Sequence, residues 1–248
     1  IGHNLGALAG AIGAGMGSFG IATDGDADRI GAMDERSTFV DPHKIMSLAL
    51  RYLVEKRGLT GSVVRTVSTT RMIDRLAKKY GLTVRETPVG FNYIADYMMK
   101  EQVLIGGEES GGIGFSGHIP EGDGVLMGLL IIEMVAAAGT TLYEMVEDLQ
   151  REVGPALYER IDLRLKYPVA KEKMVQMLVN NPPASIGGES LLEVSTLDGV
   201  KYIFSDDSWL LIRPSGTEPV LRVYAEGRST EMVKELLKFG RSIADSIA

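Results

Sequence analysis

Apolar residues recur along this chain in two ways, with a helical period and as the short continuous runs typical of buried strands. Between residues 42 and 153, segments of helical period alternate with such runs. Helices are predicted at 42–57, 70–80, 91–100, 123–138 and 141–153, and strands at 62–67, 82–86 and 103–105. Because strands alternate with helices, this region is predicted to form a parallel α/β sheet.

Particular residues mark the ends of these elements. Asp41-Pro42 predicts a helix start, since Asp is a favoured N-cap and Pro suits the first turn. Asp123 is expected to cap the helix that follows it. Gly81 predicts a helix end, and Gly154-Pro155 breaks the alternation of strands and helices.

After residue 154 the pattern becomes that of an α+β domain. Strands are predicted at 158–165, 191–196, 201–204, 209–213 and 221–226, and helices at 170–179 and 230–247. Asp198-Gly199 lies between the second and third of these strands and predicts a hairpin turn.

The chain is therefore predicted to have three parts. Residues 1–40 hold a weak helix at 4–12 and one strand, which is too little to fold alone. Residues 41–153 form a mixed α/β domain, and residues 154–248 form a smaller α+β domain. The sequence begins at Ile1 rather than Met, with a stretch rich in Gly and Ala, which indicates the interior of a longer polypeptide.

The composition is that of a globular protein, with 45% hydrophobic and 24% charged residues among 248. A net charge of −7 argues against nucleic-acid or anionic-membrane partners.

The apolar run 125–138 is interrupted by Glu133 and is too short to span a bilayer, so it is predicted to be a buried helix. The absence of Cys excludes disulfides and thiol catalysis and suits the reducing cytoplasm. No signal peptide is expected, because no basic segment begins the chain.

The strongest candidate for chemistry is the acidic run that follows the apolar residues 19–22. Asp24, Asp26 and Asp28 occupy every second position. In an extended backbone this alternation would place the three carboxylates on one side. Converging carboxylates repel one another unless a cation lies between them, and Mg²⁺ or Ca²⁺ prefers such oxygen ligands. Arg29 adds a positive charge suited to an anion beside the metal, and a metal with an anion indicates phosphate chemistry.

Taken alone, the acidic run allows three other interpretations. In an EF-hand, Asp24, Asp26, Asp28 and Glu35 would fall at loop positions 1, 3, 5 and 12, but Arg29 stands where Gly is required and the flanks are predicted strands. In an aspartyl-nucleophile phosphatase of the haloacid-dehalogenase type, Asp24 would be phosphorylated and Asp26 would act as acid and base. The third interpretation is a solvated turn.

A glycine-rich loop at 106–112 follows the predicted strand 103–105. Glycines at the carboxyl end of a strand let a ligand approach the backbone. Glu108 and Ser110 can accept and donate hydrogen bonds to the vicinal hydroxyls of a sugar. The same loop is also compatible with an ordinary turn.

A third loop, residues 213–219, lies between two predicted strands. Its guanidinium, its hydroxyls and its backbone amides suit a phosphate dianion, although a rigid turn is the simpler interpretation. The groups concerned belong to Arg213, Ser215, Gly216 and Thr217.

Together the three loops resemble those of the alpha-D-phosphohexomutase family, which includes phosphoglucomutase, phosphomannomutase and phosphoglucosamine mutase. The run DGDADR resembles its magnesium loop, GEESGG its sugar-binding loop and RPSGTEP its C-terminal phosphate-binding loop, in the same order. The resemblance covers essentially the whole chain. It implies that residues 1–40 are the end of domain 2 of four, 41–153 domain 3 and 154–248 domain 4. The forms of the last two motifs favour a phosphoglucomutase or phosphomannomutase over a glucosamine mutase.

The resemblance implies an isomerase that works by phosphoryl transfer and interconverts hexose 1-phosphate and hexose 6-phosphate, with glucose or mannose as the sugar. A phosphoserine would donate its phosphoryl group to the substrate, and the other phosphate of the hexose 1,6-bisphosphate intermediate would return to the serine. Asp24, Asp26 and Asp28 would hold Mg²⁺, and Arg29 would anchor the phosphoserine. Glu108 and Ser110 would bind the sugar. The non-reacting phosphate would be held by Arg213, Ser215, Gly216 and Thr217.

The family's nucleophilic serine lies in a Ser-His-Asn-Pro-like motif that this sequence does not contain. The resemblance therefore implies that the N-terminal half of the same polypeptide is a required partner, and that this chain alone is inactive. The alternative is a non-catalytic fragment that binds sugar phosphates. Three positions depart from many relatives, which have Lys, His and Arg where this chain has Asn92, Gly112 and Gly122. A cation lost near the sugar would weaken binding or alter specificity.

Overall fold

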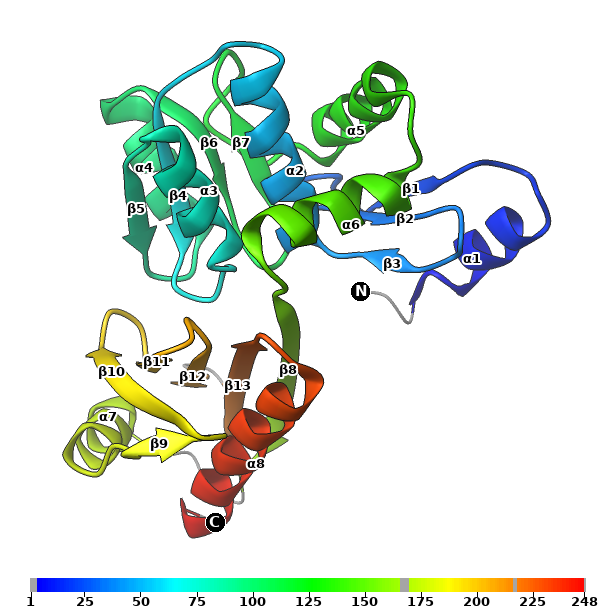
Figure 1. The fold of residues 1–248 in the computed structure, drawn as a ribbon. Helices are drawn as coiled ribbons and strands as arrows, with labels where there is room; N and C mark the ends of the chain where they lie inside the picture. Colours follow the sequence, from blue (N-terminus) through cyan, green and yellow to red (C-terminus); the bar gives the residue numbers. More distant parts are fainter. Residues whose placement is uncertain (1–3, 166–169, 216–217, 248) are drawn as a thin grey trace. The chain divides into compact units, whose positions relative to one another are not determined.

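The computed structural model describes residues 4–165, 170–215 and 218–247. The chain divides into two compact units, Ile1–Gly154 and Pro155–Ala248, each described by itself (Figure 1). Residues 4–40 pack with the predicted α/β domain in the first unit, and the division falls at the Gly154-Pro155 step.

The described residues of the first unit form two sheets. A three-stranded antiparallel sheet consists of β1 (Gly20–Thr23), β2 (Ile30–Met33) and β3 (Phe39–Val40). A four-stranded sheet has the order β5 (Val84–Thr87), β4 (Ser62–Thr66), β6 (Val103–Gly107) and β7 (Ile113–Phe115). Strands β5, β4 and β6 are parallel, which confirms the prediction, but β7 runs antiparallel to β6. The glycine-rich loop between β6 and β7 is too short for the crossover that a parallel strand would need.

The described residues of this unit form the helices α1 (Gly6–Gly13), α2 (Pro42–Glu55), α3 (Met72–Tyr80), α4 (Phe91–Lys100), α5 (Gly124–Ala138) and α6 (Leu142–Val153). Two adjacent glycines let helices approach the sheet closely. A Cβ at Gly106 would overlap Ile94 of α4, and a Cβ at Gly107 would lie 2.8 Å from the sulfur of Met46 of α2. Since successive strand residues point to opposite faces, α4 and α2 cover opposite faces of the four-stranded sheet.

Helix α5 is less buried than its apolar sequence predicted. Val125, Leu129 and Ile132 are exposed, while Leu130 and Ile131 are buried. The prediction of a fully buried helix is therefore wrong for the outer side of α5. Among the described residues, no single helix is long and apolar enough to cross a membrane. Taken together, α5 and α6 meet the length and composition criterion, but the pair is bent by 84°.

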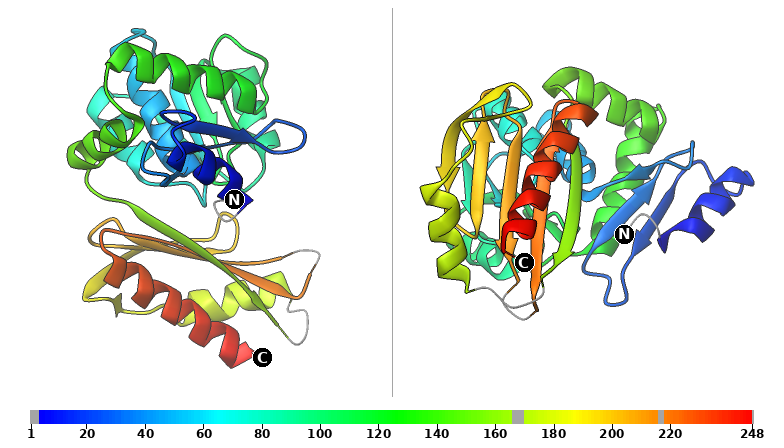
Figure 2. Two further views of the ribbon diagram at one scale, coloured as in Figure 1. Left: turned by 90° about the vertical axis from the view of Figure 1, so that its right-hand side faces the viewer. Right: turned by 90° about the horizontal axis from the view of Figure 1, so that it is seen from below.

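The second unit is the predicted α+β domain. Its antiparallel sheet has the order β8 (Leu157–Arg164), β13 (Val220–Gly227), β12 (Trp209–Pro214), β11 (Val200–Phe204), β10 (Glu189–Ser195) and β9 (Ser185–Ile186). Helices α7 (Lys171–Asn180) and α8 (Thr230–Ile247) pack on the same face of this sheet (Figure 2). The core between them includes Tyr202, whose hydroxyl donates to the carbonyl of Leu178 in α7 at 2.8 Å.

A buried arginine joins three elements of the first unit. Arg65 of β4 is only 3% exposed. Its Nε and Nη2 donate to the two carboxylate oxygens of Asp74 in α3, both at 2.8 Å, and its Nη1 donates to Glu86 of β5 at 2.6 Å. A buried charge is tolerated only when it is paired, so this arrangement links α3 to the sheet.

We expect Arg65→Met to lower the free energy of unfolding by about 2–4 kcal/mol, because it removes the buried charge that both carboxylates contact. Arg151→Met is the matched control. Arg151 is 74% exposed and pairs with Asp148 at the surface, where pairs contribute less than about 1 kcal/mol. Urea unfolding followed by circular dichroism measures both variants, and equal losses would contradict the role of Arg65.

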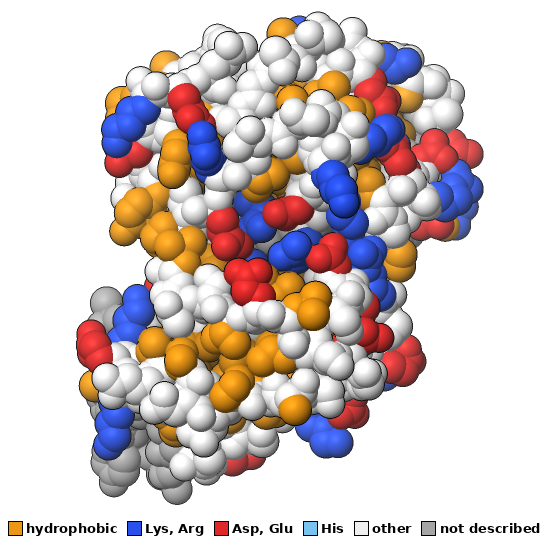
Figure 3. All heavy atoms as spheres, turned by 60° about the vertical axis from the view of Figure 1, so that its left-hand side comes forward, with side chains coloured by type: hydrophobic (Ala, Val, Ile, Leu, Met, Phe, Trp, Pro, Cys, Tyr) orange, Lys and Arg blue, Asp and Glu red, His pale blue; other side chains and the backbone are white. Residues whose placement is uncertain are grey.

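Basic and acidic side chains are interspersed on the face of the molecule drawn in Figure 3.

Candidate functional site

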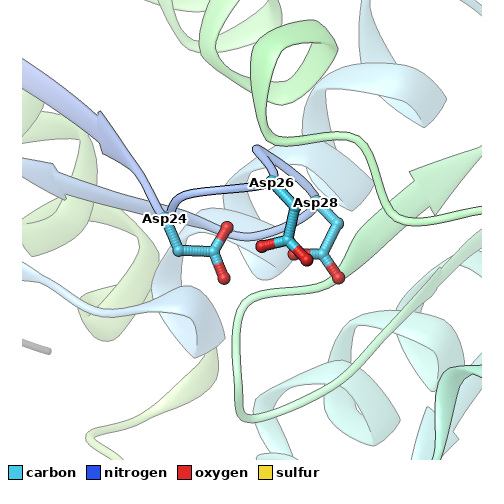
Figure 4. A group of neighbouring side chains, drawn as sticks. All are labelled: Asp24, Asp26 and Asp28. Carbon is cyan, nitrogen blue, oxygen red and sulfur yellow. The ribbon is translucent and has the colours of Figure 1, made fainter.

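The acidic loop joins the ends of two paired strands. Thr23 of β1 lies opposite Ile30 of β2, so the six residues between them form a tight connection. Asp24, Asp26 and Asp28 converge there, each with a carboxylate oxygen within 4.8 Å of the others (Figure 4). A turn produces this convergence.

The extended backbone assumed from the sequence is wrong. Ala27 has a φ of +59°, and its amide donates to the carbonyl of Asp24 at 3.2 Å. The chain therefore folds back within the acidic run. The carboxylates meet because the backbone curves around them, not because alternate residues share one side of a strand.

The charges in this loop fit a divalent cation. Burial, followed by the negative charges of Asp24 and Asp26, raises the pKa of Asp28, while the charge of Arg29 lowers it. The Oδ1 atom of Asp28 is buried and has no hydrogen-bond partner among the described residues. The Nε of Arg29 lies 3.3 Å from Asp24 and 3.7 Å from Asp28, so its guanidinium accompanies these carboxylates. A hard cation with oxygen ligands would relieve the repulsion and would engage the oxygen that lacks a hydrogen bond.

The predicted sugar loop brings Glu108 and Ser110 together. The Ser110 hydroxyl donates to Glu108 Oε2 at 3.4 Å, and the amide of Gly90, just before α4, donates to Glu108 Oε1 at 2.9 Å. Burial raises the pKa of Glu108, and these two hydrogen bonds oppose the rise. The carboxylate is thus held in one orientation beside a hydroxyl.

The acidic loop and the sugar loop are joined through their backbones, although they are about 80 residues apart in sequence. Arg29 and Gly112 form an antiparallel β-bridge, and the amide of Ile30 donates to the carbonyl of Gly111 at 3.1 Å. The amide of Gly124 donates to the carbonyl of Ala27 at 2.8 Å. The structure therefore places the candidate metal ligands next to the candidate sugar-binding residues.

Glycines make this close approach possible. Gly111 has a φ of +105°, and a Cβ there would lie 2.7 Å from the carbonyl oxygen of Ile30. A Cβ at Gly124 would overlap the carbonyl of Arg29. Sequence reasoning missed both contacts, because nothing in a local pattern shows which distant backbone a glycine faces.

Two of the three positions at which the sequence is expected to depart from relatives, Gly122 and Gly112, lie in this region. A Cβ at Gly122 would lie 2.8 Å from the carbonyl oxygen of Asp28, so a larger residue there requires a different local backbone. A Cβ at Gly112 would lie 3.6 Å from Glu108 Oε2, so a side chain there would stand beside the sugar-loop carboxylate. Asn92 is exposed in the first turn of α4.

Asp123 caps α5, as predicted. Its Oδ1 accepts the amide of Leu126 at 2.8 Å, and its Oδ2 lies 2.9 Å from His118 Nε2. The amide of Asp123 donates to the carbonyl of Ile113 in β7. The start of α5, which contacts the acidic loop through Gly124, is thereby attached to the strand that follows the sugar loop.

The predicted phosphate loop belongs to the second unit. Arg213 lies in β12, and the amide of Ser215 donates to the carbonyl of Val220 at 2.8 Å, where the loop returns to β13. Gly216 and Thr217 lie outside the described residues. Arg213 Nε donates to Asp198 at 2.7 Å, a contact that sequence reasoning did not anticipate.

The EF-hand interpretation is wrong. Strands β1 and β2 flank the acidic loop, where an EF-hand has helices. Glu35, the would-be twelfth loop residue, lies in the turn between β2 and β3, and its carboxylate accepts the amide of Tyr143 in α6 at 3.3 Å.

We expect Gly111→Ala to weaken Mg²⁺ binding and Gly117→Ala to leave it within about twofold. Both glycines have a positive φ, +105° and +92°, so both alanines cost about 1 kcal/mol in backbone strain. Only at position 111 would the added Cβ meet the backbone of Ile30, the residue that directly follows the acidic loop. Calorimetric titration with Mg²⁺ compares the two variants, and equal affinities would show that this contact does not shape the metal site.

Mg²⁺ affinity should fall as the pH is lowered from about 7.5 towards about 4.5. The raised pKa of Asp28 means that this carboxylate protonates at a higher pH than an ordinary Asp, and only the ionised form binds a metal. Asp28→Asn should bind more weakly but with a flatter pH dependence. Parallel pH profiles in the two proteins would exclude Asp28 as the titrating ligand.

Comparisons with known proteins show the family to which this chain belongs. The family profile described as phosphoglucomutase/phosphomannomutase, alpha/beta/alpha domain III, matches residues 41–153, and the profile for the C-terminal domain of the same family matches residues 168–239. The phosphoglucomutase/phosphomannomutase of Thermococcus kodakarensis is 33% identical over 222 residues, which cover 90% of this chain and 46% of that protein. The phosphoglucosamine mutase of Methanocaldococcus jannaschii is 37% identical over 227 residues, which cover 89% and 47%.

Among solved structures, the putative phosphomannomutase from Thermus thermophilus is 34% identical, with a TM-score of 0.82, over 99% of this chain and 50% of that one. The chain thus spans about half the length of the relatives that it matches. With both domain profiles matched and this level of identity, the chain belongs to the phosphoglucomutase/phosphomannomutase family of alpha-D-phosphohexomutases.

Proposed function

We propose that this chain forms the metal-binding, sugar-binding and phosphate-binding part of a magnesium-dependent phosphohexomutase. The enzyme would interconvert hexose 1-phosphate and hexose 6-phosphate. The observation that carries the proposal is the backbone junction between the acidic loop and the sugar loop at Arg29 and Gly112. Through this junction, the three carboxylates that could bind a metal lie beside Glu108 and Ser110, which could bind a sugar. Phosphoryl transfer to a sugar hydroxyl requires such an arrangement.

Each group in the first unit has a role in this proposal. Asp24, Asp26 and Asp28 would hold Mg²⁺, which when bound would neutralise negative charge on the transferring phosphoryl group. Arg29 would offer its guanidinium to the phosphoserine next to the carboxylates. Glu108, oriented by the Gly90 amide, would accept hydrogen bonds from sugar hydroxyls.

The second unit would hold the phosphate that does not react. Arg213 and Ser215, with Gly216 and Thr217 outside the described residues, would supply charge-assisted hydrogen bonds to a dianion. The phosphoserine itself would come from the N-terminal half of a longer polypeptide, because the serine motif of the family is absent from this sequence.

Glucose or mannose is the proposed sugar. The relative named phosphoglucosamine mutase, at 37% identity, makes an amino sugar the second candidate. Assays of the full-length enzyme with glucose 1-phosphate, mannose 1-phosphate and glucosamine 1-phosphate separate the two. The largest kcat/KM for glucosamine 1-phosphate would overturn the first assignment.

The chain alone should bind Mg²⁺ and glucose 1-phosphate without converting it to glucose 6-phosphate. Asp26→Asn should reduce Mg²⁺ affinity about tenfold or more, because it removes one of three charged ligands. Asp96→Asn, at an exposed position of α4, is the control for the same change of charge. Calorimetry measures binding, and a coupled assay with Mg²⁺ and glucose 1,6-bisphosphate measures turnover. Turnover well above background would show that a nucleophile lies within this chain and would revive Asp24 in that role.

A further inference from the structure

A buried carboxylate in the second unit contacts the arginine of the phosphate loop. Asp198 lies in the turn between β10 and β11, and its side chain is only 7% exposed. Its Oδ2 accepts Arg213 Nε at 2.7 Å, and its Oδ1 accepts Lys171 Nζ, from the start of α7, at 2.9 Å. One carboxylate thus binds two cations that come from different elements.

The backbone holds this carboxylate against β12. Gly199 has a φ of +88°, and a Cβ there would lie 2.5 Å from the carbonyl oxygen of Ile212 and 3.1 Å from the Cα of Arg213. Val200 pairs with Ile212 in the sheet, so the register of β11 and β12 sets the turn beside Arg213. Asp198 is therefore anchored by main-chain packing rather than by its ion pairs alone.

The contact between Asp198 and Arg213 restricts the orientation of the guanidinium. The group is planar, and a carboxylate on its Nε edge restricts rotation of the plane. The two terminal Nη groups form the fork that matches two oxygens of a phosphate. An arginine whose plane is already restricted loses less rotamer freedom when a phosphate binds.

We propose that Asp198 is a positioning residue for phosphate binding: it holds the guanidinium plane of Arg213 through Nε, so that the terminal Nη groups can engage a phosphate, and Lys171 holds the second oxygen of Asp198. This inference rests on the proposed phosphate site. It differs from the view that Asp198 only balances charge. As a counter-charge, Asp198 would weaken the attraction for a dianion, so its neutralisation would tighten binding. As a positioning residue, its neutralisation would loosen binding.

The sign of the change in affinity therefore tests the proposal. We expect Asp198→Asn to weaken binding of inorganic phosphate and of glucose 1-phosphate about fivefold to tenfold, although it makes the unit more positive. Asp162→Asn is the control. Asp162 pairs with Arg160 at 2.9 Å in β8, so the variant makes the same change of charge elsewhere in the unit, and it should not weaken binding.

A double-mutant cycle shows whether Asp198 acts through Arg213. In the Arg213→Lys background, Asp198→Asn should cause no further loss, because lysine has no Nε edge to orient. Binding is measured by NMR titration of the whole chain, and the amide spectrum reports whether each variant is folded. Binding by Asp198→Asn that equals or exceeds that of the wild type overturns the inference, as does an undiminished effect in the Arg213→Lys background.

A measurement on the wild-type chain tests the inference even if Asp198→Asn does not fold. The Nε–H proton of Arg213 should exchange with water at least tenfold more slowly than that of the exposed Arg151, before any phosphate is added. Equal exchange rates would overturn the inference. A wild-type chain that shows slow exchange at Arg213 but binds no phosphate would instead refute the proposed phosphate site, and the positioning role would fall with it.

Discussion

The candidate metal site of the first unit depends on one constraint: the carboxylates of Asp24, Asp26 and Asp28 have to be held close together. Like charges at this separation repel, and burial, followed by the charges of Asp24 and Asp26, raises the pKa of Asp28. Backbone hydrogen bonds oppose the repulsion: the amide of Ile30 is held by the carbonyl of Gly111, and the carbonyl of Ala27 by the amide of Gly124. Because both glycines allow main chains to approach more closely than any side chain would, the acidic turn keeps its shape through contacts distant in sequence.

Features with a local cause could be predicted from the sequence. The bounds of α4 and α8, the N-caps at Asp41 and Asp123, and the left-handed end of α3 at Gly81 all follow from residues within one turn of the feature. Features set by distant packing could not. The exposure of one side of α5 depends on what that helix packs against. The antiparallel β7 was also missed, although its cause is local: the short glycine-rich loop before it allows only an antiparallel return.

Within the candidate site, too, features with a local cause were predictable and features set by distant packing were not. The residue types of the acidic run were enough to indicate a cation, but the extended backbone inferred from their spacing was wrong, since alternation in sequence does not distinguish a strand from a turn. Asp198 was recognised only as a turn residue. Its partner Arg213 is 15 residues away, and only the register of β11 and β12 brings the two together.

The proposed ligand groups of the two units are Asp side chains in one and an Arg side chain in the other, and each type would be positioned by different means. An Asp side chain is short, so its carboxylate goes where the backbone turn directs it, and rigid main-chain contacts at Gly111 and Gly124 are sufficient. An Arg side chain has several rotatable bonds, and ordering it costs up to about 2 kcal/mol. Backbone rigidity in β12 alone cannot orient the guanidinium of Arg213, so a second side chain has to do so. Asp198 meets that requirement, because the sheet fixes its position and Lys171 engages its other oxygen.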